Sequence, residues 1–199
     1  MRLGIYGGTF SPVHNGHVNA ANAFFTQAAL DKLLIIPVSI PPHKKVDFPV
    51  SAKKRLKMCA LAFDGVGEVS DIEIRRKGKS YTYDTVCELN SLGYDDIYLL
   101  CGTDMLLTFD KWHRFDEILK KVTLAHVLRS DPTECEADAI RKKTEELTSL
   151  YGARIIDVAV DPVDISSTRI REMIARGEDA SEFLPEKEYE YIKKERQYV

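Results

Sequence analysis

The sequence predicts an α/β fold, a doubly wound and mostly parallel sheet with helices on both faces (three layers), in one domain over residues 1–199. Short apolar runs alternate with segments of helical periodicity along the chain, which is typical of repeated strand–helix–strand units. Residues 33–38 (Leu-Leu-Ile-Ile-Pro-Val) are apolar throughout, as strands buried on both faces are. The length of 199 residues and the hydrophobic content of 44% suit a domain with a full core.

Local signals place each element. In the first helix Val18, Ala21, Phe24, Phe25, Ala28 and Ala29 are predicted to share one face. Ser51 can cap a helix that carries Leu56, Cys59, Ala60 and Phe63, and Gly93 and Gly177 suit helix ends. Strands are expected at residues 3–6, 33–38, 66–74, 97–101, 122–128 and 155–160. Helices are expected at 18–29, 52–63, 86–92, 136–150, 168–175 and from Pro185, with helical turns at 105–109 and 115–119, and about 165–199 forms a helical part packed on the domain.

The net charge and the cysteine content limit the kinds of partner and of metal or redox site that we expect. The net charge of −3 predicts neither nucleic acid nor a membrane as a partner, and the basic runs 43–45, 53–55 and 75–77 are interpreted as solvated faces. Four widely spaced cysteines without a C-x-x-C argue against a zinc or redox centre. We expect a cytoplasmic protein, since there is neither an export signal nor an apolar run long enough to span a bilayer.

The loop after the first strand, residues 7–17, reads Gly-Gly-Thr-Phe-Ser-Pro-Val-His-Asn-Gly-His. Glycines let the backbone turn sharply and approach a ligand, and the helix start that follows suits phosphate. His14 and His17 are three residues apart, so both can face one object. Taken singly, the glycines could form an ordinary turn and each histidine could be a plain helix-start residue.

This string resembles the signature of the nucleotidylyltransferase superfamily, whose H-x-G-H core is shared with class I aminoacyl-tRNA synthetases. The resemblance implies that His14 and His17 are catalytic. It also implies that they bind ATP together with Gly7, Gly8, Thr9, Phe10 and Gly16. The sequence departs from the family at Ser11, where the family usually has Asp.

The end of the fourth strand is predicted to join this site. Strands one and four are neighbours at the switch point of a doubly wound sheet, so Gly102 and Asp104 would line the same crevice. Asp104 could accept hydrogen bonds from ribose hydroxyls or merely cap the following helix. Neither G-x-G-x-x-G nor the P-loop string occurs after the first strand, which disfavours a dehydrogenase or a P-loop kinase.

A second motif, residues 165–171, reads Ile-Ser-Ser-Thr-Arg-Ile-Arg. Hydroxyls at a helix start with arginines nearby favour an anion, although a plain N-cap with solvated arginines would suffice for Ser166 or Arg169 alone. The string resembles the I-S-S-T-x-I-R motif of nicotinate and nicotinamide mononucleotide adenylyltransferases. That resemblance implies that Ile165, Ser166, Ser167 and Arg171 bind the triphosphate of ATP.

Three further blocks resemble the nicotinate-specific bacterial branch, the nicotinate-nucleotide adenylyltransferases: Pro-Pro-His-Lys at 41–44, Ser-Tyr-Thr-Tyr-Asp-Thr at 80–85, and Gly102-x-Asp104 followed by Trp112. Trp112 offers a flat face to a cationic pyridinium ring, or is a core residue; Lys44 suits a phosphate, or is a surface lysine. Helix-start N–H groups near Thr82 can take a carboxylate, or Thr82 only caps. The predicted mononucleotide-binding residues are Thr9, Lys44, Thr82, Tyr83, Thr85, Asp104, Trp112 and Arg129, the last of which could also be merely exposed.

The resemblance implies transfer of the adenylyl group of ATP to nicotinate mononucleotide, in NAD biosynthesis. Mg²⁺ would be bound by substrate phosphates rather than by a protein cage, and a zinc site at His14 and His17 is disfavoured because further ligands are lacking nearby. The alternatives are an adenylyltransferase for nicotinamide mononucleotide or phosphopantetheine, and a non-catalytic nucleotide-binding regulator. A synthetase is disfavoured by length, net charge and the absence of K-M-S-K-S. An oligomer is possible.

Overall fold

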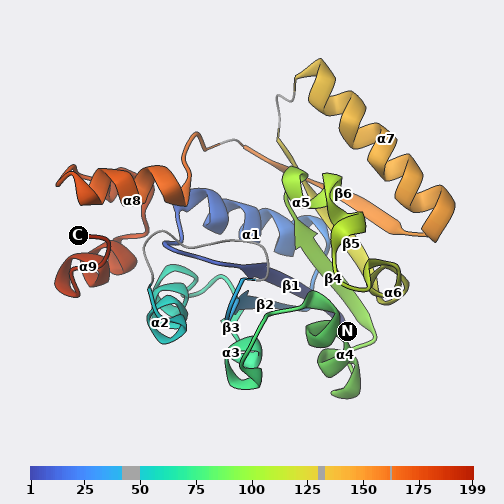
Figure 1. The fold of residues 1–199 in the computed structure, drawn as a ribbon, viewed down its shortest axis with the longest axis horizontal. Helices are drawn as coiled ribbons and strands as arrows, with labels where there is room; N and C mark the ends of the chain where they lie inside the picture. The colour runs from blue at the N-terminus through green and yellow to red at the C-terminus, as the bar shows by residue number, and fades with distance from the viewer. Residues whose placement is uncertain (42–49, 130–132, 162) are drawn as a thin grey trace. The chain divides into compact units, whose positions relative to one another are not determined.

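The computed structural model describes residues 1–41, 50–129, 133–161 and 163–199, and strands alternate with helices along these parts of the chain (Figure 1). The strands are β1 Arg2–Gly8, β2 Lys32–Pro37, β3 Glu68–Val69, β4 Asp96–Cys101, β5 Val122–Arg129 and β6 Arg154–Val160. The α-helices are α1 Asn15–Gln27, α2 Ala52–Ala62, α3 Ile72–Arg76, α4 Thr82–Ser91, α5 Thr103–Leu107, α6 Phe115–Lys121, α7 Glu134–Tyr151, α8 Ser167–Ala175 and α9 Glu186–Lys194. Two 3-10 helices are η1 Phe109–Lys111 and η2 Ser181–Phe183.

The six strands form one sheet in the order β3-β2-β1-β4-β5-β6, which is the order of doubly wound nucleotide-binding sheets. Strand β1 pairs with β4 in parallel, with Arg2 opposite Asp96 and Ile5 opposite Leu99. The pairs β2–β3, β4–β5 and β5–β6 are also parallel. The predicted fold class is therefore confirmed, as is the prediction that strands one and four are neighbours.

The chain divides into two compact units that are interleaved in sequence. The first unit comprises residues 1–6, 22–33 and 81–162, and the second comprises 7–21, 34–80 and 163–199. Strands β1 and β2 each begin in the first unit and end in the second. The single domain expected from the sequence stays a prediction.

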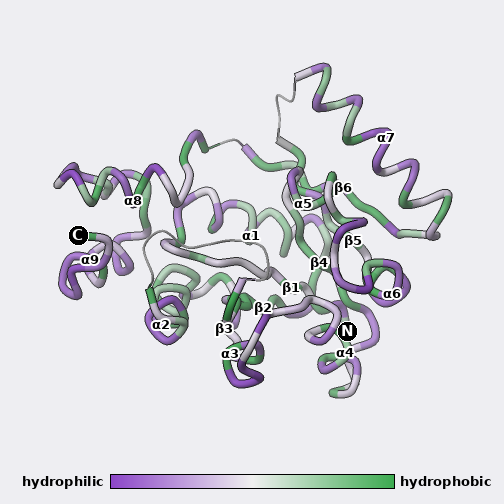
Figure 2. The backbone as a smooth tube through the Cα atoms, viewed as in Figure 1, coloured by the Kyte–Doolittle hydropathy of each residue, from purple (hydrophilic) through white to green (hydrophobic). Residues whose placement is uncertain are grey.

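The core of the first unit lies along β4 and β5. Ile97, Leu99 and Leu100 of β4, and Leu124 and Ala125 of β5, are buried, and both strands include apolar stretches when coloured by hydropathy (Figure 2). Helix α7 has one buried residue, Leu147. Its start is fixed by a reciprocal capping box between Thr133 and Glu136.

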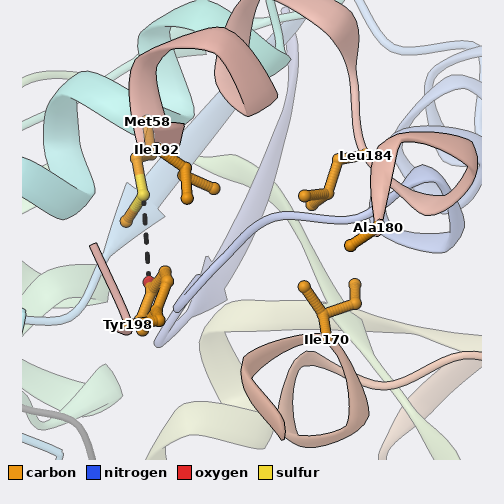
Figure 3. Close-up of a cluster of buried hydrophobic side chains, with 6 residues drawn as sticks. All are labelled: Met58, Ile170, Ala180, Leu184, Ile192 and Tyr198. Carbon is orange, nitrogen blue, oxygen red and sulfur yellow. Dashed lines mark hydrogen bonds between the residues drawn. The ribbon is translucent and has the colours of Figure 1, made fainter. Parts of the chain in front are cut away.

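The core of the second unit joins α2, α8 and α9. Met58, Ile170 and Ile192 are buried there with Ala180, Leu184 and Tyr198 (Figure 3). The phenol of Tyr198 points to the sulfur of Met58, at 3.8 Å. Because Tyr198 follows α9, this cluster connects the last part of the chain to α2, the helix after β2.

One predicted element is wrong. The sequence predicts a strand over residues 66–74, but only Glu68 and Val69 are strand and residues 72–76 form helix α3. The spacing of Ile72 and Ile74 resembles the alternation of a strand. The backbone N–H of Arg75 instead donates to the carbonyl of Asp71, and their side chains form an ion pair. These local bonds favour one helical turn over an extended strand.

Across the described residues, no helix is both long enough and apolar enough to cross a membrane.

Candidate active site

The loop between β1 and α1 is shaped by the packing of Phe10 against Gly8. Phe10 has a left-handed backbone (φ 48°) and is 2% exposed. A Cβ on Gly8 would lie only 2.8 Å from the Phe10 ring. At Gly7 the nearest atom would be 4.0 Å away, the carbonyl oxygen of Ile36. Gly8 is therefore required by contact with its own loop, while Gly7 leaves open space beside the backbone.

The rings of the two histidines lie against one another, tilted, at the start of α1. The ring centroids of His14 and His17 are 3.7 Å apart, with 31° between the ring planes. A Cβ on Gly16 would lie 3.1 Å from Nδ1 and 3.2 Å from Cε1 of His14. The ring of Phe10 meets that of His17 edge-on, at 5.4 Å. The glycine of H-x-G-H therefore makes room for the His14 ring, and Phe10 supports the His17 ring.

Hydrogen bonding defines which nitrogen of His17 can act as a donor. The backbone N–H of His14 donates to Nδ1 of His17, at 3.1 Å. A neutral imidazole that accepts at Nδ1 carries its proton on Nε2. Burial, followed by the nearby charge of His14, lowers the pKa of His17 well below 6.5, and burial lowers the pKa of His14 to about 4. Both rings are thus neutral at pH 7, and His17 presents an N–H.

The start of α8 is tied to this loop through two residues of the second motif. The hydroxyl of Ser167 donates to the carbonyl of Pro12 (2.8 Å), and the guanidinium of Arg171 donates to the carbonyl of Ser11 (2.9 Å) and to the hydroxyl of Thr168 (3.1 Å). Ser166 is the N-cap, with its side chain accepting from Arg169 N. The structure thus brings the second motif to residues 9–14, the loop between β1 and α1, which we call the histidine loop. Ser166 serves as the N-cap of α8.

Ile165 precedes the cap and packs, partly buried, against the apolar cluster of the second unit. Thr9 contributes its carbonyl to Arg55, whose N–H lies 2.9 Å away. These two predicted ATP-binding residues belong to the second unit with both motifs.

Arg55 supports the candidate site and was missed from the sequence, because the run 53–55 was expected to be a solvated face. Arg55 is 3% exposed and donates to the carbonyls of Thr9, Val38 and Ser39, at 2.9, 2.6 and 3.0 Å. It connects the ends of β1 and β2. The buried face of α2 is Arg55, Met58, Cys59 and Ala62, and this helical spacing was the signal that could have found it.

Ser11 is buried, and its hydroxyl lies 2.9 Å from the phenol of Tyr198. The side chain at this position therefore points into the protein in hydrogen-bond contact with the last part of the chain. Tyr198 was also missed, since nothing in its neighbourhood along the sequence connects it to the loop.

In the first unit, the segment after β4 holds Gly102, Thr103 and Asp104. Gly102 is the N-cap of α5, while Asp104 is exposed and its carbonyl accepts from the hydroxyl of Thr108. The side chain of Thr103 lies 3.2 Å from Nε2 of the fully buried His126, and Nδ1 of His126 lies 3.1 Å from Asp157. This hydrogen-bonded row runs from the start of α5 across β5 to β6, and it was not predicted from the sequence. It ties Thr103, the residue before Asp104, to β5.

The start of α4 lies beside the turn that carries Trp112. Thr82 is the first residue of α4 and Tyr81 is its N-cap, so Thr82 is not the cap. The guanidinium of Arg114 lies 3.9 Å from the ring centroid of Tyr83, and the Tyr81 and His113 rings are 4.7 Å apart. Thr85 is buried, and its hydroxyl donates to the carbonyl of Tyr81. The predicted substrate residues of the 80–85 block and the Trp112 turn are thus brought together.

Trp112 stacks on the buried ring of Phe109, with the centroids 4.8 Å apart and the planes at 24°. It is only half-buried, so part of the indole stays accessible to a ligand. Arg129 is the last residue of β5, the position predicted for it. Lys44, with Pro42 and His43, lies outside the described residues.

Across the parts of the chain that the structure describes, no group of three or more His, Cys, Asp or Glu side chains is placed to hold a metal ion.

The fold and the loop define the class of protein. The family model described as cytidylyltransferase-like matches residues 5–173, and the chain belongs to this family. Proteins named "Probable nicotinate-nucleotide adenylyltransferase" are 36% identical in Clostridium tetani (96% of this chain, 95% of that protein) and 38% identical in Lactococcus lactis (99% and 95%). The protein of that name from Carboxydothermus hydrogenoformans is 38% identical (96% and 94%). The resemblance inferred from the motifs is thereby confirmed.

Solved structures show the same fold. Plasmodium falciparum nicotinic acid mononucleotide adenylyltransferase complexed with NaAD has a TM-score of 0.77 at 14% identity, covering 99% of this chain and 97% of that one. The same enzyme complexed with APC has a TM-score of 0.71 at 13% identity, covering 99% and 96%.

Proposed function

We propose that this chain transfers the adenylyl group of ATP to nicotinate mononucleotide, giving deamido-NAD⁺ and pyrophosphate. The observation that carries the proposal is the pair of neutral imidazoles packed against one another, one with its Nε2–H defined, on a loop tied to the start of α8. Relatives named for this activity, which align with nearly the whole of this chain, support the proposal.

The reaction needs no general base. An oxygen of the mononucleotide 5′-phosphate, whose second pKa is about 6, attacks the α-phosphorus of ATP in line. The bond from the α-phosphorus to the oxygen bridging to the β-phosphorus breaks, and its electron pair leaves with pyrophosphate. The protein's part is therefore to position two anions and to stabilise the charge that develops.

In the second unit, Nε2 of His17 would donate to an oxygen of the α-phosphate, and His14 would add a second donor. Phosphate oxygens beside the rings raise the pKa of each imidazole, so positive charge becomes available where negative charge grows. Gly7, Gly8, Thr9, Phe10 and Gly16 would form the loop around ATP, and Ile165, Ser166, Ser167 and Arg171 would place the start of α8 at the β- and γ-phosphates. Since Arg171 already bonds Ser11 and Thr168, much of its effect would be through the loop.

In the first unit, the accessible part of Trp112 would face the pyridinium ring, where its π-system attracts the cation. Thr82, Tyr83 and Thr85 at the start of α4 would receive the nicotinate carboxylate, which favours the acid over the amide. Asp104 would accept from a ribose hydroxyl, with Gly102 leaving space beside it. Lys44 and Arg129 would add positive charge near phosphate. Mg²⁺, when bound to ATP, would be held by phosphate oxygens and water and supply charge neutralisation.

Product analysis tests the proposal. The protein is mixed with ATP, Mg²⁺ and either nicotinate or nicotinamide mononucleotide, and the dinucleotide and pyrophosphate are quantified. Deamido-NAD⁺ formed with equimolar pyrophosphate is expected, with faster turnover of the acid. Faster turnover of the amide would favour a nicotinamide mononucleotide enzyme, and no pyrophosphate with either would favour a non-catalytic nucleotide binder.

A further inference from the structure

A glutamate side chain is fully buried among the helices of the second unit. Glu188 is 0% exposed and lies on α9, four residues before Ile192 of the apolar cluster in Figure 3. Residues four apart share a helix face, so an apolar side chain would be the ordinary occupant of this position. Burying a carboxyl group costs free energy unless its oxygens make hydrogen bonds, so Glu188 is expected to bind a donor inside the protein.

Glu188 holds one end of a peptide group in the histidine loop. Its Oε1 accepts from the backbone N–H of Val13, at 3.0 Å. The same peptide group offers the carbonyl of Pro12, which accepts from Ser167 at 2.8 Å. Helices α9 and α8 therefore fix the two polar ends of a single peptide plane. The peptide group between Pro12 and Val13, just before His14, is therefore held at both its carbonyl and its N–H.

The effect of this peptide reaches His17 in one further step. The next N–H along the chain, that of His14, donates to Nδ1 of His17. That bond selects the tautomer with its proton on Nε2 and sets the angle of the ring. A rotation of the peptide held by Glu188 would be passed to the peptide that follows it, and so to the ring.

The surroundings of Glu188 favour its uncharged form. Burial raises its pKa well above 4.5, although the bond from Val13 acts in the opposite direction. Cys59 on α2 and Tyr198 after α9 interact electrostatically with Glu188, and burial raises the pKa of both. Arg55 on α2 and Arg171 on α8 direct N–H groups to carbonyls of the loop and of the segment after β2. A neutral carboxyl has one carbonyl-type oxygen for Val13, and Oε2 is buried without a hydrogen-bond partner in the described part of the chain.

We propose that Glu188 is a positioning residue for the paired imidazoles: by holding the Val13 N–H it fixes the peptide that precedes His14 and thereby aligns Nε2 of His17 on the reacting phosphate. This inference rests on the proposed function. It assigns no contact between Glu188 and substrate.

Two substitutions separate positioning from packing. E188Q keeps the acceptor oxygen, while E188M keeps an unbranched side chain of similar length without an acceptor. We expect E188M to keep its Tm within a few degrees and to lose roughly 10- to 100-fold in kcat, because small misplacements of reacting groups are costly, with KM for both substrates within about twofold. E188Q should keep at least half of kcat, and E190Q, at an exposed position of the same helix, serves as the matched control.

A pH profile supplies a second readout that uses only the wild type and E188Q. When Glu188 ionises as the pH rises, a charge appears in its buried environment, so the wild type should lose kcat on a high-pH limb that E188Q lacks. Wild-type kcat in E188M, equal loss in E188Q and E188M, or pH profiles that coincide for the wild type and E188Q would each overturn the proposal. Failure of the wild type itself to form deamido-NAD⁺ would instead count against the proposed function.

Discussion

Replacing Gly16 with alanine tests how closely activity depends on the position of the His14 ring. The added Cβ would lie 3.1 Å from Nδ1 and 3.2 Å from Cε1 of His14, and 3.5 Å from Cβ of Val163. The two ring contacts are tighter than nine in ten real Cβ contacts, so the ring has to move by a few tenths of an ångström. Gly16 has a backbone compatible with alanine, since it is the second residue of α1.

The structure predicts that G16A keeps its thermal stability but loses activity. Alanine is up to about 1 kcal/mol more favourable than glycine in a helix interior, and less at the second residue of α1, so G16A should unfold close to the wild-type Tm or slightly above it. If a misplacement of 1 Å costs about 100-fold, a shift of a few tenths of an ångström should lower kcat about 3- to 10-fold. That loss corresponds to about 0.7–1.4 kcal/mol of transition-state stabilisation.

The assay is the initial rate of pyrophosphate release at saturating ATP and mononucleotide, with Tm measured in parallel. N19A changes an exposed position of the same helix and controls for helix propensity. Full kcat in G16A, together with unchanged NMR signals of the His14 ring, would refute the argument that Gly16 serves the ring. A loss of kcat shared equally by N19A would show that the helix, and not the ring, is responsible.

Three further predictions address the imidazoles and the indole. H17A should lower kcat by roughly 10²- to 10³-fold, the effect of losing one oxyanion donor, with little change in Tm; near-normal turnover would remove His17 from the mechanism. W112A should raise KM for the mononucleotide about 5- to 30-fold, from a cation–π contribution of about 1–2 kcal/mol, and an unchanged KM would contradict the stacking. Because burial lowers the pKa of His14 to about 4, its ring should titrate near pH 4 by NMR. The unfolded chain then binds more protons between pH 4 and 6.5, so the free energy of unfolding should rise with pH across that window, and less steeply in H14Q; a ring that titrates near pH 6.5 would contradict this assignment.

The elements with strong local signals were predictable from the sequence. The apolar runs of β2, β4 and β5, the Ser51 cap and the turn after α4 depend on neighbours within a few residues. The expected strand at 66–74 failed because Ile72 and Ile74 fit a strand pattern while the Asp71–Arg75 contacts favour a helical turn. The outcome there depends on single side-chain contacts that periodicity does not record.

The residues of the candidate site that belong to a motif could be predicted from the sequence. The residues that support the site from distant parts of the chain could not. His14, Gly16 and Ser167 stand in strings that identify them, although the strings do not record how closely Gly16 contacts the His14 ring. The partners of the loop are remote: Arg55 is 46 residues from Thr9, and Tyr198 is 187 residues from Ser11. A buried polar residue on an apolar helix face was the available signal for Arg55, and the same signal marks Glu188 on α9.

The histidine loop turns its backbone oxygens toward the protein. The carbonyls of Thr9, Ser11 and Pro12 accept from Arg55, Arg171 and Ser167 respectively. A carbonyl oxygen aimed at a triphosphate would repel it, so the inward direction of these dipoles removes an electrostatic penalty before any nucleotide arrives. The loop would accordingly take up its polyanionic ligand without first reversing peptide groups, which saves reorganisation at the moment of reaction.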